Sequence, residues 1–238
     1  MVAGDLWTVN LGLVEYREAW ALQERVRAAR QVDAIPDTLL LLEHPPVYTR
    51  GRRSQPGELG FGEDWYRARG IDIVDVDRGG LLTYHGPGQL VGYPIMRVAD
   101  LMAYVQTMES AIVAALADEG LGDVRGGSAE GRERIGVWRD ERKVASIGVH
   151  RAREVTTHGF AVNVDNDLAP FGWVVACGLP DVRMTSVSEE LGGGGGRGRL
   201  PCLRKRMAFR FAEAFGRRQR LVSAARLEAA LGAVAAVA

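Results

Sequence analysis

The amino-acid sequence predicts an α/β fold in which a mixed β-sheet is flanked by helices. Two apolar alternating runs, 71–76 and 90–95, have the period of half-buried strands. The segment 101–119 instead repeats its apolar residues every three or four positions, which is typical of a helix that packs on one face. Three apolar segments at 135–138, 144–149 and 157–164 are bounded by turn residues and indicate successive strands.

The remaining elements follow from the same periodicities. The N-terminal part predicts strands at 6–14, 38–42 and 47–49 and helices at 16–30 and 64–69. Asp100 is suited to cap the start of the helix 101–119, and Gly120 is suited to end it.

The C-terminal part predicts a second long helix at 200–220, followed by an Ala-rich tail that can add another. The run Gly192–Gly198 predicts a mobile surface loop. We expect one domain over residues 1–238, and the alternative is a small C-terminal lobe that begins at about residue 190.

The composition limits the functional classes. The formal net charge is zero, which argues against non-specific binding of nucleic acid. We expect a cytoplasmic protein without membrane contact, because no basic and apolar leader precedes the first strand and no apolar run is long enough to span a bilayer. The two cysteines, Cys177 and Cys202, lack metal-site spacing, so we expect no metal site and two free thiols.

The stretch Arg78–Gln89 reads RGGLLTYHGPGQ, and five of its twelve residues are Gly or Pro. Glycine allows backbone N–H groups to approach a ligand closely, so a loop of this kind can cradle a carbonyl or an oxyanion. The alternative is a tight hairpin loop with a capped His85.

Lysine is scarce in this chain. Of thirty basic residues only Lys143 and Lys205 are lysines, and the others are arginines. Arg does not deprotonate in proteins, whereas Lys can act as an acid or a base. Lys205 stands in LRKR, where a solvated helix face explains it, but Lys143 begins the apolar run KVASIGV. We therefore regard Lys143 as a candidate functional residue.

Cys177 stands at the end of the apolar run 171–177, directly before Gly178. A free Cys can be a small core residue, or it can be a nucleophile if a nearby cation or base lowers the pKa of its thiol. His85 and His158 each stand between a hydroxyl-bearing run and a glycine, so either can bind a carbonyl, orient a base or satisfy buried backbone groups.

Several of these stretches occur together in the octanoyltransferase (lipoate-protein ligase B) family, which the sequence strongly resembles over about residues 39–188. The motifs that carry the resemblance are EHPPVYTRGRR (43–53), RGGLLTYHGPGQLVGYP (78–94), KVASIGV (143–149), THGFAVNV (157–164), ACG (176–178) and MTS (184–186). The resemblance implies a fold like that of the lipoate and biotin protein ligases. It also implies transfer of an octanoyl group from octanoyl-acyl carrier protein, through a Cys thioester, to a lysine of a lipoyl-accepting domain. Such acceptors are the lipoyl domains of 2-oxoacid dehydrogenases and the glycine cleavage H protein.

The resemblance assigns Cys177 as the nucleophile and Lys143 as the residue that lowers its pKa and carries protons. It assigns His158 a supporting role, and no cofactor is implied because a thioester is already activated. The substrate pocket that it implies consists of Arg78, Gly79, Gly80, Leu81, Leu82, Thr83, Tyr84, His85, Ser146, Ile147, Gly148, Gly159, Phe160 and Ala161. Backbone N–H groups of Gly79, Gly80 or the Ser-Ile-Gly segment are candidate oxyanion donors.

Two alternatives remain at this stage: an ATP-dependent ligase of the lipoate or biotin type, and a non-catalytic protein that binds acyl carrier protein or a lipoyl domain. A basic face on the last predicted helix offers a docking surface for an acidic carrier protein, or it is a solvated face. Its residues are Arg204, Arg206, Arg210, Arg217, Arg218 and Arg220.

Overall fold

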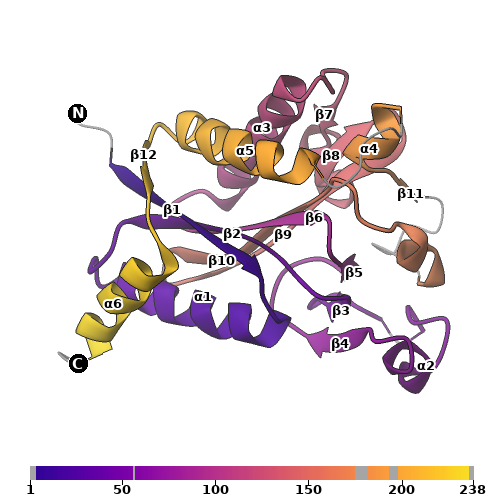
Figure 1. Cartoon of the computed structure of the whole chain (residues 1–238), viewed down its shortest axis with the longest axis horizontal. Helices are drawn as coiled ribbons and strands as arrows, with labels where there is room; N and C mark the ends of the chain where they lie inside the picture. Colours follow the sequence, from indigo (N-terminus) through magenta and orange to yellow (C-terminus); the bar gives the residue numbers. More distant parts are fainter. Residues whose placement is uncertain (1–3, 56, 175–181, 193–197, 236–238) are drawn as a thin grey trace.

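A mixed nine-stranded sheet forms the centre of the computed structural model, which describes residues 4–55, 57–174, 182–192 and 198–235 (Figure 1). Its strand order is β12-β1-β2-β6-β10-β9-β8-β7, and β11 pairs with the start of β9 on the edge opposite β8. The bounds are β1 Asp5–Leu13, β2 Asp37–Glu43, β6 Gln89–Ile95, β7 Arg125–Gly126, β8 Gly136–Arg139, β9 Arg142–Ala152, β10 Val155–Asn163, β11 Arg183–Met184 and β12 Arg218–Leu221. Strand β1 runs parallel to β2 and β12, whereas β2, β6, β10, β9 and β8 are antiparallel neighbours. The predicted α/β class with a mixed sheet is confirmed.

A smaller three-stranded sheet lies at one end of the molecule, next to the short helix α2 (Glu63–Arg67) (Figure 1). Its order is β4 (Asp72–Asp75), β3 (Val47–Arg50) and β5 (Leu82–His85). The glycine-rich stretch 78–89 therefore is not a hairpin loop, because β5 belongs to this small sheet and β6 to the large one. A four-residue strand inside the stretch is the feature that the sequence prediction lacked.

Helices cover both faces of the large sheet. Helices α3 (Leu101–Asp118) and α5 (Arg199–Ala214) lie on one face, and α1 (Tyr16–Gln31) and α6 (Ala224–Ala235) lie on the other (Figure 1). The predicted cap of α3 is confirmed, since the Asp100 carboxylate accepts hydrogen bonds from the N–H groups of Met102 and Ala103 at 2.8 and 3.1 Å. The shorter helical segments are α4 Val187–Glu190 and the 3₁₀ turns Ser128–Glu130, Arg132–Arg134 and Ala169–Trp173.

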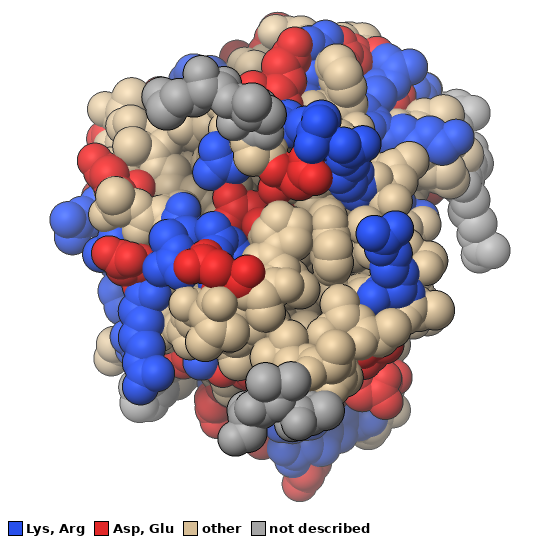
Figure 2. All heavy atoms as spheres, turned by 90° about the vertical axis from the view of Figure 1, so that its left-hand side faces the viewer, with Lys and Arg blue, Asp and Glu red and all other residues tan. Residues whose placement is uncertain are grey.

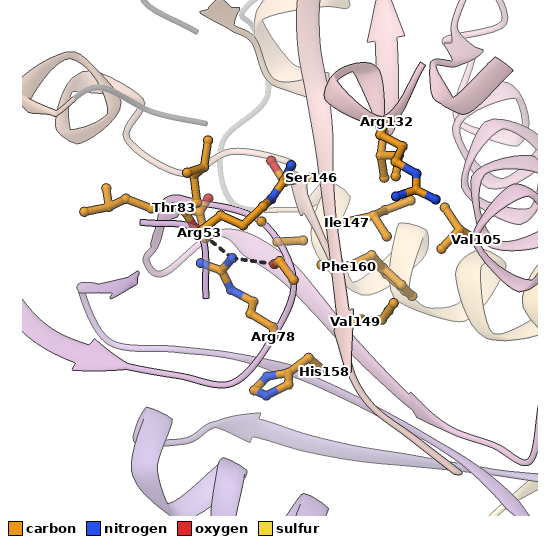
Figure 3. A pocket seen from close by; sticks show the side chains of 18 of the residues that line it. Arg53, Arg78, Thr83, Val105, Arg132, Ser146, Ile147, Val149, His158 and Phe160 are labelled. Atoms are coloured by element: carbon orange, nitrogen blue, oxygen red, sulfur yellow. Dashed lines mark hydrogen bonds between the residues drawn. The ribbon is translucent and has the colours of Figure 1, made fainter. Parts of the chain in front are cut away.

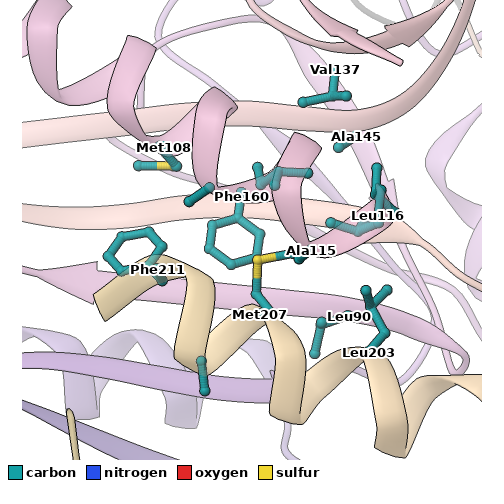
Figure 4. Packing of buried hydrophobic residues seen from close by; sticks show 14 of the residues in the cluster. Leu90, Met108, Ala115, Leu116, Val137, Ala145, Phe160, Leu203, Met207 and Phe211 are labelled. Carbon is teal, nitrogen blue, oxygen red and sulfur yellow. The ribbon is translucent and has the colours of Figure 1, made fainter. Parts of the chain in front are cut away.

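The two faces of the sheet form two separate cores. In β2, Leu39 and Leu41 pack toward α3 and α5, whereas Leu40 and Leu42 pack toward α1. Successive side chains of a strand point to opposite faces, so a strand covered on both sides is apolar throughout. Figure 4 shows the first core, in which residues of α3 and α5 meet Phe160 of β10.

The predicted helix 200–220 was wrong in its last third. Helix α5 ends at Ala214, and Gly216 has a left-handed φ of 59°. Glycine adopts this conformation without the steric cost that other residues pay, so it reverses the chain there. The next residues form β12, which extends the large sheet beside β1.

Because α5 ends at Ala214, the six arginines expected on one basic helix face are divided between α5 and the residues that follow it. Three of its arginines lie on α5, where each is ion-paired: Arg204 with Glu43, Arg206 with Glu119 and Arg210 with Asp118. The other three follow the helix, where Arg217 pairs with Asp37, and Arg218 and Arg220 pair with Asp5. On the face drawn in Figure 2, basic and acidic side chains accordingly lie next to each other. The prediction of one basic helix face was wrong.

Within the described part of the chain, none of the helices combines the length and the hydropathy that are needed to cross a bilayer.

Candidate active site

A cavity of about 570 Å³ opens where the glycine-rich stretch meets β9, β10 and the start of α3. The cavity is lined by the expected pocket residues Arg78, Gly79, Gly80, Leu81, Leu82, Thr83, His85, Ser146, Ile147, Gly148, Gly159, Phe160 and Ala161, and also by Lys143 and His158. They come from three chain segments, 78–85, 143–148 and 158–161, and the first lies far from the other two in the sequence. Figure 3 shows Arg78 and Thr83 on one side of the cavity and Val105 and Arg132 on the opposite side.

Tyr84 is the expected pocket residue that the structure does not place on the cavity wall. Strand β5 alternates its side chains, so Thr83 and His85 line the cavity while Tyr84 points away. The Tyr84 ring packs against Tyr48 and Phe171, with centroid distances of 5.4 and 5.5 Å.

Arg78 holds the glycine-rich stretch in shape. Its guanidinium donates to the carbonyl oxygen and to the hydroxyl of Thr49, both at 2.7 Å. It also donates to the carbonyl oxygens of Leu81, at 2.8 Å, and Gly79, at 3.1 Å. A buried cation that binds carbonyls from both sides of a loop fixes the backbone path of that loop.

The same stretch lies directly against the edge of β9. The N–H of Gly79 donates to the carbonyl of Val149 at 3.0 Å, so this N–H is occupied and is not an oxyanion donor in this conformation. A side chain at Gly148 would meet the carbonyl oxygen of Gly79 at 2.9 Å. Glycine is thus required at position 148 for this close approach of two backbones. The Ser-Ile-Gly segment is part of strand β9, which confirms the strand predicted over 144–149.

Lys143 comes from a β-bulge at the start of β9. The register with β8 pairs Trp138 with Lys143 and Val137 with Ala145, so Val144 has no counterpart. A bulge of this kind redirects side chains and is common beside active sites. Lys143 is buried, with 4% of its surface exposed, and its Nζ lies 5.0 Å from the centroid of the Trp138 ring.

Cys177 and Ala176 lie outside the described residues. The described chain ends at Val174, which bridges to Leu59, and begins again at Val182. Strand β11 follows at once, and its Met184 pairs with Lys143. The segment that carries Cys177 therefore rejoins the described structure alongside Lys143. The expected loop around the glycine run 192–198 falls largely outside the described residues as well.

Three of the four histidines, His44, His85 and His158, lie beside α1, where their rings contact Tyr16 or Trp20. His158 has a left-handed φ of 58° inside β10, and its N–H donates to the Gln23 side-chain oxygen at 2.7 Å. Its Nε2 lies 2.8 Å from an Asp77 carboxylate oxygen, and its Nδ1 lies 3.3 Å from the Tyr16 hydroxyl. His150 also faces Asp77, at 3.4 Å.

His44 and His85 belong to the same group. His44 Nδ1 lies 2.7 Å from the carbonyl of Val14, which can only accept, so this nitrogen carries the proton. His44 Nε2 then accepts from the Tyr93 hydroxyl at 2.6 Å. His85 Nδ1 donates in the same way to the Gln89 amide oxygen at 2.7 Å. These contacts satisfy buried polar groups, one of the roles that the sequence left open for His85.

Burial keeps these imidazoles neutral. It lowers the pKa of His44 to about 4 and the pKa of His85 well below its ordinary value. Burial also lowers the pKa of His158, although the hydrogen bond to Asp77 opposes the shift. Asp77 stays ionised, because the hydrogen bond from His158 lowers the pKa of this carboxyl. Neutral His158 therefore donates from Nε2 to Asp77 and accepts at Nδ1 from Tyr16.

Several cavity residues escaped the sequence analysis. Tyr16, Arg53, Tyr93, Leu101, Met102, Val105, Arg132, Glu133, Ile135 and Val149 also line the cavity. Arg53 and Tyr93 stand inside the motifs that carried the resemblance, and membership of these motifs is the sequence feature that could have marked them as cavity residues. Nothing in the local pattern of α1 or α3 marks Tyr16 or Val105, because helix packing brings them to the cavity. Among the described residues, no group of three His, Cys, Asp or Glu side chains is arranged to hold a metal ion.

The fold is that of the lipoate protein ligases. The crystal structure of lipoate-protein ligase A bound with ATP superposes with a TM-score of 0.78 at 19% identity, covering 98% of this chain and 94% of that one. A bipartite lipoate protein ligase from Thermoplasma acidophilum gives 0.72 at 18% identity, covering 98% and 92%. At this level of identity the likeness concerns the fold alone.

The model of the lipoyl protein ligase A/B catalytic domain matches residues 15–198, and the chain belongs to that family. Within it the chain belongs with the octanoyltransferases. The octanoyltransferase of Mycobacterium ulcerans is 50% identical over 195 residues, covering 77% of this chain and 78% of the relative. Those of Acidothermus cellulolyticus and Corynebacterium jeikeium are 48% and 42% identical over 190 and 203 residues. They cover 76% and 80% of this chain, and 80% of each relative. The resemblance seen in the sequence is confirmed.

Proposed function

We propose that this protein transfers an octanoyl group from octanoyl-acyl carrier protein to a lysine of a lipoyl-accepting domain, with Cys177 as the thioester carrier. The observation that carries the proposal is a largely apolar cavity that contains the buried amine of Lys143. The segment with Cys177 joins β11, which pairs with Lys143. Relatives that cover most of the chain are octanoyltransferases.

The apolar part of the cavity suits an acyl chain. Val105 of α3, Ile147 of β9 and Phe160 of β10 present hydrocarbon surface to the cavity. Burial of each methylene contributes about 0.8 kcal/mol, so the chain supplies much of the binding energy. Neighbouring chain lengths differ by only one or two such steps, so the depth of the cavity discriminates between them modestly.

In the first half-reaction the Cys177 thiolate attacks the carbonyl carbon of the donor thioester. The bond to the donor sulfur breaks, and that sulfur leaves as a thiol after it takes the proton of the Lys143 ammonium. An ammonium beside a thiol favours the thiolate form, which is the nucleophile. Because Gly79 is hydrogen-bonded to Val149, the N–H of Gly80 and those of the 146–148 segment remain our candidates for the oxyanion site.

In the second half-reaction the amine of the acceptor lysine attacks the Cys177 thioester. The neutral Lys143 amine accepts a proton from the attacking nitrogen, the carbon–sulfur bond breaks, and Cys177 leaves as a thiolate. An amide forms and the enzyme returns to its starting state. The reaction uses no cofactor in this proposal, because the thioester donor is already activated.

The acceptors that we propose are the lipoyl domains of 2-oxoacid dehydrogenases and the glycine cleavage H protein, and the proposed location is the cytoplasm. Octanoyltransferase relatives support acceptors of this kind.

The experiment is to incubate the purified protein with octanoyl-acyl carrier protein, without ATP, and to measure the mass of the intact protein. We expect one octanoyl increment, which disappears when a lipoyl domain is added and the domain gains it. Cys177→Ser abolishes the increment. Cys202→Ser is the matched control, because Cys202 is exposed on α5, and this variant keeps the increment.

Two results would overturn the proposal. Absence of the adduct together with turnover of ATP and free octanoate would establish a ligase. Binding of carrier protein or lipoyl domain with neither adduct nor turnover would establish a non-catalytic binding protein.

A further inference from the structure

The position of the Lys143 side chain depends on a glycine in the neighbouring strand. Gly136 begins β8 with a φ of 137°, which side chains rarely allow. A β-carbon at this position would lie 2.6 Å from Lys143 Cε and 3.4 Å from Lys143 Nζ. It would also lie 2.5 Å from the carbonyl oxygen of Ala145. The space beside Gly136 is thus filled by the end of the lysine side chain.

A buried carboxylate on α3 fixes Gly136. Glu109 is 4% exposed, and its Oε1 accepts hydrogen bonds from the N–H of Gly136 at 2.9 Å and from the N–H of Ser128 at 3.1 Å. Its Oε2 accepts from the Ser128 hydroxyl at 2.5 Å. Among the described residues no cation forms an ion pair with Glu109, so backbone and hydroxyl donors hold this carboxylate.

The loop between Ser128 and Gly136, the two residues that Glu109 binds, forms a wall of the cavity. It carries Arg132, Glu133 and Ile135, which line the cavity, and ends at Gly136. A further bond, from the N–H of Gly127 to the carbonyl of Gly136 at 2.9 Å, closes the loop on itself. Glu109 therefore links helix α3 to Gly136, the residue beside which the end of the Lys143 side chain lies.

We propose that Glu109 and Gly136 are positioning residues for Lys143: the Glu109 carboxylate holds Gly136 in its left-handed conformation, and Gly136 leaves the space that directs the amine into the cavity. This inference rests on the proposed function where it concerns turnover. The placement of the lysine is a structural statement and can be tested separately.

The placement test uses the scarcity of lysine. Labelling with [ε-¹³C]lysine gives two NMR signals, and Lys205→Arg leaves the signal of Lys143 alone. The Trp138 ring, whose centroid lies 5.0 Å from Nζ, shifts this signal through its ring current. We expect Gly136→Ala to move the Lys143 signal toward the position of a free lysine.

Gly131→Ala is the matched control. Gly131 lies in the same loop with nearly the same φ of 133°, but a β-carbon there would meet nothing within 4 Å. Both variants place a side chain at a similar positive φ, but only the one at 136 meets other atoms, namely the end of Lys143 and the carbonyl oxygen of Ala145. We expect Gly131→Ala to keep the Lys143 signal at its wild-type position. Its kcat should stay within about twofold of wild type. We expect kcat of Gly136→Ala to fall about 100-fold with little change in KM for the carrier protein, because misplacement of a reacting group by about 1 Å costs a factor of this size.

Glu109 is tested by two substitutions. Glu109→Leu removes the acceptor for the buried N–H of Gly136 and the part-buried N–H of Ser128, and we expect a displaced Lys143 signal and a kcat lowered about tenfold or more. Glu109→Gln keeps one oxygen for both N–H groups, and its amide can donate to the Ser128 hydroxyl. We expect this conservative variant to keep the Lys143 signal near its wild-type position and kcat within about threefold of wild type.

The outcomes separate the two ideas. If Gly136→Ala or Glu109→Leu stays folded and leaves the Lys143 signal and kcat unchanged, the positioning role is wrong. A Glu109→Gln variant as impaired as Glu109→Leu would also contradict it. If wild-type protein transfers no octanoyl group but the NMR signals change as described, the proposed function fails and the positioning of Lys143 stands.

Discussion

On one side of the cavity the imidazoles and phenols bind one another and the main chain, whereas on the other side a lysine amine lies against a glycine and an indole ring. The histidine side comes from α1, β5, β6, β10 and the residue that follows β2, and burial holds its imidazoles neutral. The lysine side comes from β8, β9 and a bulge between them. In the proposed reaction the histidines, which many enzymes use for acid–base catalysis, support the cavity instead. The proton chemistry of the proposed reaction falls to Lys143.

The strongest test of this comparison is Lys143→Arg, which keeps the charge and removes the titratable amine. We expect acyl transfer to fall by about 10³-fold, because proton transfer by a positioned group contributes about 10²–10⁴-fold. The measurement is kcat with octanoyl-acyl carrier protein and a lipoyl domain. A variant with near-wild-type rates would show that the positive charge alone is needed.

The neutral histidines make folding stability depend on pH. The folded pKa of His44, about 4, lies below its ordinary value of 6.5, so the unfolded state takes up the proton first as the pH falls. The stabilisation from neutral His44 is therefore complete above about pH 6.5 and is lost as the pH falls toward 4, by at most about 3 kcal/mol. Urea denaturation between pH 7 and 4 measures it. A His44→Asn variant should show a smaller decline, and an equal decline would assign the effect to other groups.

The Asp77–His158 pair tests whether the histidine side only supports the cavity. Asp77→Ala leaves the His158 Nε2–H without its acceptor, which costs about 1–3 kcal/mol of unfolding free energy. We expect kcat to fall by no more than about tenfold and the pH–rate profile to keep its shape, because Lys143 is unchanged. Loss of one limb of that profile would instead assign a proton-transfer role to His158.

The smallest effect is expected far from the cavity. Arg217 pairs with the buried carboxylate of Asp37, which also binds Arg30 and the N–H of Arg97. We expect Arg217→Ala to lower the unfolding free energy by about 1 kcal/mol, or Tm by a few degrees, without a change in KM for the carrier protein. Calorimetry and steady-state kinetics measure the two quantities. A raised KM at unchanged Tm would restore the docking role first expected for this arginine.

The sequence by itself determined most of the longer strands, the main helices and the family, because periodicity and turn residues are local. The strand 38–42 and the helix 101–119 are of this kind, and the structure confirms both. The scarcity of lysine, together with the apolar run that Lys143 begins, already singled out Lys143 among the basic residues.

Only the tertiary structure decided which side chains meet. The Tyr16 hydroxyl reaches His158 across 142 positions of the chain, and no local pattern encodes that contact. Residues 218–221 form a strand rather than a helix because an edge of β1 is available to pair with them. Gly136 likewise was unremarkable in the sequence, since its role arises from a bulge that turns Lys143 toward it.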